Sequence, residues 1–136
     1  MITYNTDGVG MPKMKKRLIN RWIRAVAATY GRKVGDIGYM FVDDEKILEV
    51  NNDYLGHDYY TDIITFDYVK GKTISGDIFI SLTRISENAS ILSSSFEKEL
   101  LRVLAHGVLH LCGYKDKSDE EQKEMRAKED FYINLF

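Results

Sequence analysis

Two periodicities of hydrophobic residues divide this chain into strands and helices. Short apolar stretches, or stretches that alternate hydrophobic and polar positions and are rich in β-branched residues, predict strands. Stretches whose hydrophobic residues recur roughly every three to four positions predict helices. The predicted strands are residues 2–6, 36–42, 62–69 and 73–81. The predicted helices are residues 12 or 13 to 30, 43 or 44 to 54, 82–92, 95–111 and 118–134.

Residues at the helix ends agree with these boundaries. Gly31 follows the first helix at the position where a left-handed residue commonly ends a helix. Ser95 can cap the fourth helix, because a serine side chain accepts a hydrogen bond from a free backbone N–H of the first turn. Ser118 and Glu121 have the spacing of a capping box, which predicts where the last helix begins.

The order of these elements predicts the fold class. A helical crossover between strands favours parallel neighbours, whereas residues 70–72 form a loop so short that the strands beside it must be antiparallel. We therefore expect one α+β domain over residues 1–136, with a mixed sheet of about four strands, helices mainly on one face and the histidine-bearing helix at the centre. Gly76 interrupts the last strand, which indicates a bulge or a close approach by another backbone or a ligand.

Composition narrows the class of protein. The chain is 44% hydrophobic and 29% charged, as in ordinary globular proteins, and it contains no apolar run long enough for a membrane helix. Its N-terminus lacks the apolar core of a secretory signal, so we expect a cytoplasmic protein without membrane contact. The single cysteine, Cys112, cannot form an intrachain disulfide, which agrees with a reducing compartment.

Charge is distributed unevenly along the chain. The formal net charge of −2 argues against binding nucleic acid by bulk electrostatics. However, the segment from Lys13 to Arg24 carries six basic residues and no acid, whereas Asp43 to Asp67 carries eight acids and one lysine. The basic segment is either a solvated helix face or an edge that contacts phosphates.

The clearest candidate chemistry is a histidine pair in the fourth helix. His106 and His110 lie four residues apart in an otherwise apolar helix, so their side chains share one face. A buried imidazole without a partner costs roughly 1–3 kcal/mol, so the two histidines need partners. Their spacing alone is compatible with a structural pair or with a pair of metal ligands.

The loop after this helix favours the metal interpretation. Gly113 ends the helix and the chain then reverses, which brings Asp116 within reach as a third ligand. Three protein ligands leave one position for water, as in catalytic zinc sites. Cys112 is the competing candidate, although its position in the helix points it to the far side. Gly107 occupies the place of the glutamate in HExxH peptidases, which disfavours that activity and indicates that a strand or substrate approaches the helix.

Three blocks of the sequence resemble one known family. The segment HGVLHLCGYKD, residues 106–116, resembles the HGxLHLxGYDH signature of the YbeY-type endoribonucleases, the ribosomal RNA maturation factors. Residues 51–66, NNDYLGHDYYTDIITF, are similar to the family's N, Y and TDVLSF segment, and residues 75–81, SGDIFIS, are similar to its LGDI strand. The spacing of the blocks also agrees, and the resemblance spans roughly residues 35–130.

The resemblance implies a zinc-dependent endoribonuclease that acts on single-stranded RNA. Its substrate would be precursor rRNA, notably the 3′ end of the small-subunit RNA, and it would take part in ribosome quality control with the small ribosomal subunit. His106 and His110 match the first two ligands of one zinc ion, and Asp116 stands where the family has a third histidine. The alternative function is a ribosome-assembly or RNA-binding factor with a mainly structural metal and weak or no catalysis. Metal-dependent hydrolysis of a small molecule follows from the site chemistry alone.

Two departures from the family affect the expected chemistry. Asp116 lowers the charge of the zinc site by one unit, which makes a bound water less acidic. Leu55 stands where the family has an arginine, so the charge-stabilising role falls to Arg84, Arg102 or a lysine of the basic segment. His57 is either a proton carrier or an exposed loop histidine.

Further residues have two interpretations each. Asp77 and Ser75 could orient the metal ligands, or Asp77 could satisfy only backbone groups. A tyrosine cluster could stack unpaired bases or pack against the sheet. Its members are Tyr54, Tyr59, Tyr60 and Tyr68.

Overall fold

Strand pairing in the computed structural model, which describes residues 1–57 and 61–136, confirms the predicted α+β class and mixed sheet. The four-stranded sheet has the order β1-β2-β4-β3, in which β1, β2 and β4 run parallel and β3 is antiparallel to β4. The strands are β1 (Ile2–Thr6), β2 (Lys33–Val42), β3 (Ile63–Asp67) and β4 (Thr73–Ser81). The helices are α1 (Lys16–Thr29), α2 (Asp44–Leu55), α3 (Leu82–Ile91), α4 (Phe96–Leu111) and α5 (Asp119–Leu135).

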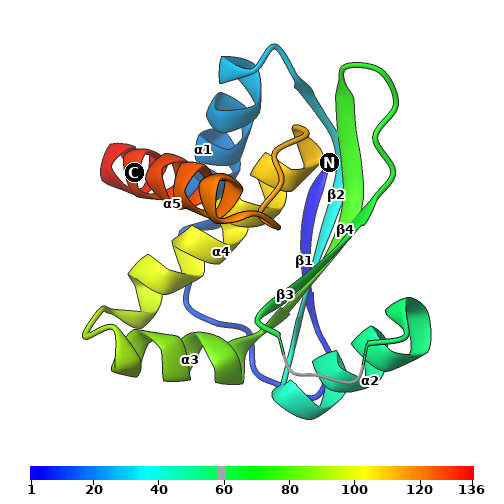
Figure 1. Cartoon of the computed structure of the whole chain (residues 1–136), viewed down its shortest axis with the longest axis vertical. Coiled ribbons are helices and arrows are strands. Elements are labelled where there is room, and N and C mark those ends of the chain that lie inside the picture. Colours follow the sequence, from blue (N-terminus) through cyan, green and yellow to red (C-terminus); the bar gives the residue numbers. More distant parts are fainter. Residues whose placement is uncertain (58–60) are drawn as a thin grey trace.

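Helices cover the sheet mainly on one side. Figure 1 shows α1, α3, α4 and α5 gathered on one side of the strands and α2 on the other. Alternate residues of β2 point to the two sides of the sheet. Tyr39 and Phe41 belong to the larger core, and Val42 belongs to a smaller core under α2. Among the described residues, no helix is both long and apolar enough to cross a membrane.

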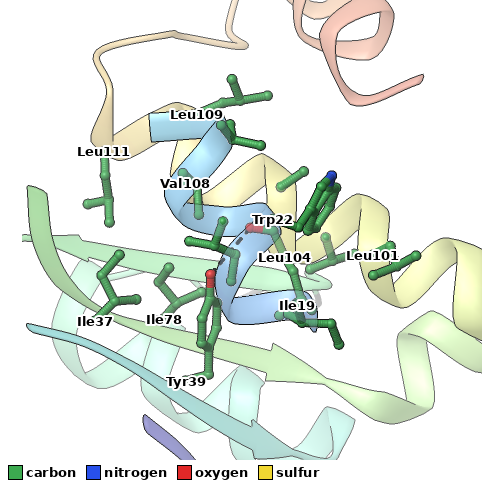
Figure 2. Packing of buried hydrophobic residues seen from close by; sticks show 14 of the residues in the cluster. Ile19, Trp22, Ile37, Tyr39, Ile78, Leu101, Leu104, Val108, Leu109 and Leu111 are labelled. Atoms are coloured by element: carbon green, nitrogen blue, oxygen red, sulfur yellow. Dashed lines mark hydrogen bonds between the residues drawn. The ribbon is translucent and has the colours of Figure 1, made fainter. Parts of the chain in front are cut away.

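Helix α4 lies at the centre of the larger core. Figure 2 shows Leu104 and Val108 packed over Ile78 and Tyr39 of the sheet, and the Tyr39 hydroxyl donates a hydrogen bond to the Leu104 carbonyl at 3.5 Å. A Cβ on Gly107 would lie only 2.8 Å from the Cδ1 atom of Ile78. The glycine therefore marks a close approach by a strand, which is one of the two causes predicted for it.

The glycine in β4 has a similar cause. A Cβ on Gly76 would collide with the backbone carbonyl oxygen of Phe66 in β3, and it would also contact Leu111 of α4. Of the three predicted causes, the close approach of another backbone is the correct one.

The helix caps follow the sequence, whereas some boundaries differ. Ser95 accepts a hydrogen bond from Lys98 N, and Ser118 and Glu121 form the complete capping box. Helix α1 begins at Lys16, later than predicted, and no side chain caps its start. The described β3 is shorter than residues 62–69, because the Asp67 carboxylate accepts a hydrogen bond from Val69 N in a turn that ends the strand.

Strand β2 begins three residues earlier than predicted. Its pairing with β4 includes Lys33 and Val34, and the register shifts between Val34 and Ile37. The irregularity contains Gly35, where a Cβ would clash with side chains of β4. A register shift interrupts the hydrophobic alternation, so the pattern alone marked only the regular part of the strand.

Candidate metal centre

Helix α4 and the loop after it bring three predicted site residues together. The Nε2 atoms of His106 and His110 lie 2.9 Å apart. The Asp116 Oδ2 atom lies 3.1 Å from His106 Nε2 and 3.3 Å from His110 Nε2. One donor atom from each residue falls within 4.8 Å of the others, so the group can hold a single metal ion. The four-residue helical spacing provides two of the donors, and the turn at Gly113, whose φ is 101°, directs the chain back to supply the third.

The hydrogen bonds on the far side of each ring orient the two histidines. His110 Nδ1 donates to the Tyr114 carbonyl oxygen at 2.8 Å, since a carbonyl can only accept. His106 Nδ1 donates to Glu129 Oε2 at 2.6 Å. Both Nε2 lone pairs therefore face the Asp116 carboxylate. With both Nε2 atoms unprotonated, three acceptors directed at one point repel one another unless a proton or a metal ion lies between them, so the donor set fits a bound metal.

A buried network of charges holds Glu129 in place. Its Oε1 atom lies 3.5 Å from Arg102 Nη1, which also donates to Asp130 at 2.7 Å, while Arg102 Nε donates to Glu99 at 3.1 Å. Glu99, Arg102 and Glu129 are all buried. Sequence reasoning did not identify Glu129. A signal was present, because it shares the buried face of α5 with Met125 and Tyr132, where a glutamate requires a partner.

The carboxylates around His106 favour a positive charge near its imidazole ring. Burial lowers the pKa of the His106 imidazole, but the hydrogen bond to Glu129 and the charges of Glu129, Asp116 and Asp62 outweigh this, so the net shift is upward. Burial also raises the pKa of the Asp62 carboxyl, against the opposing influence of His106. The site therefore contains a second carboxyl group that takes up a proton more readily than an ordinary aspartate.

Two hollows meet at the site. The larger, of about 630 Å³, is lined by both histidines and Asp116, and also by Leu55, His57, Asp62, Lys115 and Lys117. The smaller, of about 330 Å³, shares His106, Asp62 and Asp116 with it and extends towards α5. The three shared residues connect the two hollows. Sequence reasoning did not single out Asp62, although it lies in the TDIITF block.

The structure buries or pairs several of the sequence candidates, although Arg102 among them lines the smaller hollow. Cys112 is buried and its Sγ atom is not part of the ligand group. Burial raises the pKa of this thiol to about 11, which opposes formation of the thiolate that binds metals. Arg84 pairs with Asp44 at 2.9 Å. Arg102 is held in its buried network. Leu55 and His57 do line the larger hollow.

The basic segment and the predicted orienting residues lie elsewhere. No residue of the basic segment lines either hollow at the site, so a lysine from it does not reach the metal group. Ser75 Oγ accepts a hydrogen bond from Asp36 N, and Asp77 is exposed beside Tyr68. Of the two interpretations given for these residues, the one in which they orient the ligands is therefore wrong, since Glu129 and the Tyr114 carbonyl do so.

The predicted tyrosine cluster is described only in part. Tyr54 and Tyr68 are exposed, and the Tyr54 ring meets Phe66 edge-on with the centroids 5.9 Å apart. Tyr59 and Tyr60 lie outside the described residues. Tyr54 therefore contacts the sheet, as one of the two interpretations expected.

Comparisons with known proteins match the chain along its length. A family model described as Endoribonuclease YbeY matches residues 2–136. Endoribonuclease YbeY of Bacteroides fragilis is 55% identical over 128 residues, which cover 94% of this chain and 92% of that protein. Endoribonuclease YbeY of Phocaeicola vulgatus is 55% identical over 135 residues, which cover 99% of this chain and 98% of that protein. The solution structure of TM1509 from Thermotoga maritima has a TM-score of 0.66 and 30% identity, covering 98% of this chain and 87% of that chain.

Proposed function

The chain belongs to the Endoribonuclease YbeY family. We propose that it is a metal-dependent endoribonuclease that cleaves single-stranded RNA with a metal ion held by His106, His110 and Asp116. The observation that carries the proposal is the convergence of three acceptor atoms beside a hollow of about 630 Å³. A site with three protein ligands that faces a hollow is typical of catalytic metal centres.

The donor set favours zinc as the single ion. Two imidazole nitrogens and one carboxylate oxygen suit Zn²⁺, and three ligands leave a fourth position for water or substrate. When bound, the metal supplies Lewis-acid stabilisation of a phosphate oxygen and lowers the pKa of a bound water. Since Asp116 is negatively charged, that water is less acidic than it would be with three neutral histidines.

Residues of the chain perform the proton transfer and the positioning. Asp62 lines both hollows beside His106, and within the described part of the chain its carboxylate has a hydrogen bond with its own backbone but none with another side chain. We assign Asp62 as the acceptor of the proton from the attacking water. As the water oxygen bonds to phosphorus, the bond from phosphorus to the departing ribose oxygen breaks, and Asp62 returns the proton to that oxygen. Glu129 and the Tyr114 carbonyl keep the two imidazole rings in the ligating tautomer, with Nε2 unprotonated.

The physiological substrate in this proposal is precursor rRNA. Endoribonuclease is the activity in the relatives' names, and the family resemblance implies maturation of the small-subunit rRNA and action in the cytoplasm on the small ribosomal subunit. Proteins that act on RNA commonly recognise unpaired segments, whose bases are accessible. The hollow is lined by polar, charged and apolar residues, which suits a flexible polyanion better than a small apolar molecule.

Cleavage of a single-stranded RNA by the purified protein tests the activity. We expect wild-type protein to cut the RNA, and chelator treatment or the substitution His110→Ala to reduce cutting to the background rate. His57→Ala is the matched histidine control for metal content, because His57 is not in the ligand group. If cleavage persists in His110→Ala, the metal-dependent mechanism is wrong. If metal-loaded wild type binds RNA without cutting it, the result supports the alternative of an RNA-binding assembly factor.

The metal content of two variants at position 116 tests the third ligand. Asp116→Ala should lower the bound zinc measured by elemental analysis, because two ligands hold zinc weakly. Asp116→His should keep close to one zinc per chain, since an imidazole is also a good ligand. Unchanged zinc in Asp116→Ala would mean that another residue provides the third ligand.

A further inference from the structure

The metal group lies among acidic side chains, whereas RNA is a polyanion. Asp62, Asp116 and Glu129 all lie in the hollows or contact His106. Two arginines, Arg102 and Arg126, line the smaller hollow, but neither lines the larger one, and Arg102 is already paired with Glu99, Glu129 and Asp130. A phosphate strand that enters the larger hollow therefore needs positive charge from other residues.

Two lysines beside the third ligand meet this need. Lys115 and Lys117 directly precede and follow Asp116 in the loop after α4, and both line the larger hollow with the histidines. Both residues are exposed. Within the described ranges 1–57 and 61–136, no salt bridge is found for either lysine, in contrast to Arg84 and Arg102.

The positive charge of the hollow comes from few residues. Leu55, at the end of α2, lines the same hollow and carries no charge. Among the described lining residues, Lys115 and Lys117 are the only ones that carry a permanent positive charge. Their ammonium groups are compact charges on flexible side chains, which suits phosphates whose position varies along a mobile single strand.

We propose that Lys115 and Lys117 form the phosphate-binding side of the larger hollow and hold the RNA backbone next to the metal group. This inference rests on the proposed RNA substrate and does not require that the RNA be cut. Because both lysines contact the strand before and during the reaction, they contribute mainly to KM and little to kcat.

The salt dependence of RNA binding tests the inference. Binding of a fluorescent single-stranded oligonucleotide is measured by anisotropy over a range of salt concentrations, with zinc-loaded protein and a 2′-O-methyl phosphorothioate oligonucleotide that resists cleavage. For two lost phosphate contacts, the slope of log K against log salt should become shallower by about 1.4 in Lys115→Gln/Lys117→Gln. At about 0.1 M salt the same loss corresponds to roughly 25-fold weaker binding.

Matched variants separate these contacts from general charge effects. Lys70→Gln/Lys72→Gln removes the same charge from exposed residues at the turn between β3 and β4, and it should leave the slope near that of wild type. Lys115→Arg/Lys117→Arg keeps the charge and should keep the slope. Adding Leu55→Arg to the double glutamine variant places a cation at another lining position of the same hollow and should restore part of the affinity.

Separate readouts distinguish this inference from the proposed activity. Zinc content should be unchanged in the double glutamine variant, since neither lysine belongs to the ligand group. An unchanged slope in that variant, an equal loss in the Lys70/Lys72 control, or no RNA binding by wild type would overturn the inference. If the slope changes as expected but wild type never cuts RNA, the phosphate site stands and the proposed cleavage is wrong.

Discussion

The two halves of helix α4 both carry polar side chains, but they arrange them in opposite ways. In the first half, Glu99 and Arg102 form an ion pair at 3.1 Å that is extended by Glu129 and Asp130. In the second half, His106 and His110 direct acceptor atoms at each other and at a carboxylate. Opposite charges that are paired with each other need no further ligand. Acceptor atoms that converge on one point repel one another unless a cation lies between them.

Exposure of the side chains follows the same division. The exposed fraction is 10% for Arg102 and 5% for Glu99. It is 19% for His106, 26% for His110 and 38% for Asp116. We call the first half, with Glu99 and Arg102, the closed half, because its charged side chains are buried, and it contributes to stability. We call the second half, with His106 and His110, the open half, because its side chains are more exposed and available for binding. Glu129 connects them, since Oε1 lies near Arg102 and Oε2 accepts the hydrogen bond from His106.

A substitution that removes only the proton acceptor should have the largest effect on the open half. We expect Asp62→Asn to slow RNA cleavage by about 100-fold to 10,000-fold, the usual range for a general base, while zinc content stays unchanged. Since burial raises the pKa of Asp62, the wild-type rate should fall as the pH is lowered through a value above that of an ordinary aspartate. Asp62→Asn should lose this acid limb in a pH–rate profile. Cleavage at the wild-type rate would exclude Asp62 from the chemistry.

Removing the cation of the closed half should reduce stability. Arg102→Ala leaves Glu99 and Glu129 buried without their partner, which typically costs about 3–5 kcal/mol. Urea denaturation monitored by circular dichroism measures this loss. Arg126→Ala, at an exposed position of α5, is the control and should change the free energy of unfolding by less than about 0.5 kcal/mol. A similar small effect in Arg102→Ala would contradict the closed, structural role of this half.

Substitution of Glu129, which connects the two halves, should have a smaller effect, and this effect should be on metal binding. Glu129→Gln keeps the size of the side chain and removes the charge that faces His106, so zinc affinity should fall by about 10- to 100-fold. Competition with a chelating dye measures the affinity. Glu124→Gln removes the same charge from an exposed position of α5 and should leave the affinity unchanged. Equal affinities for both variants would mean that Glu129 belongs to the closed half alone.

The smallest effect is expected from the cysteine that ends α4. Cys112→Ala should leave the zinc content within the error of elemental analysis, because the thiol is not in the ligand group. Since burial raises the pKa of Cys112 from 9.0 to about 11, the folded protein should also react slowly with iodoacetamide near neutral pH. The unfolded protein in urea serves as the reactive control. Rapid alkylation of the folded protein would show that Cys112 is open to the site.

Local patterns predicted most of the fold correctly. Hydrophobic periodicity located the helices and strands, and the short loop at residues 70–72 predicted the antiparallel pair β3 and β4. The start of β2 was missed because the register shift near Gly35 depends on contacts with β4. Such contacts join residues far apart in the sequence, where no local period can reveal them.

The residues of the site also fall into those that local sequence patterns could predict and those that depend on contacts between distant elements. The histidine pair and Asp116 could be predicted to lie together from the sequence, because a helix repeat and a tight turn relate residues only a few positions apart. By contrast, Glu129, Asp62 and the two hollows come from α5, the start of β3 and the loops around them. Sequence by itself therefore determined which side chains could bind a metal. Only tertiary packing decided how they are oriented and which carboxylates surround them, because desolvation and charge act through space between elements.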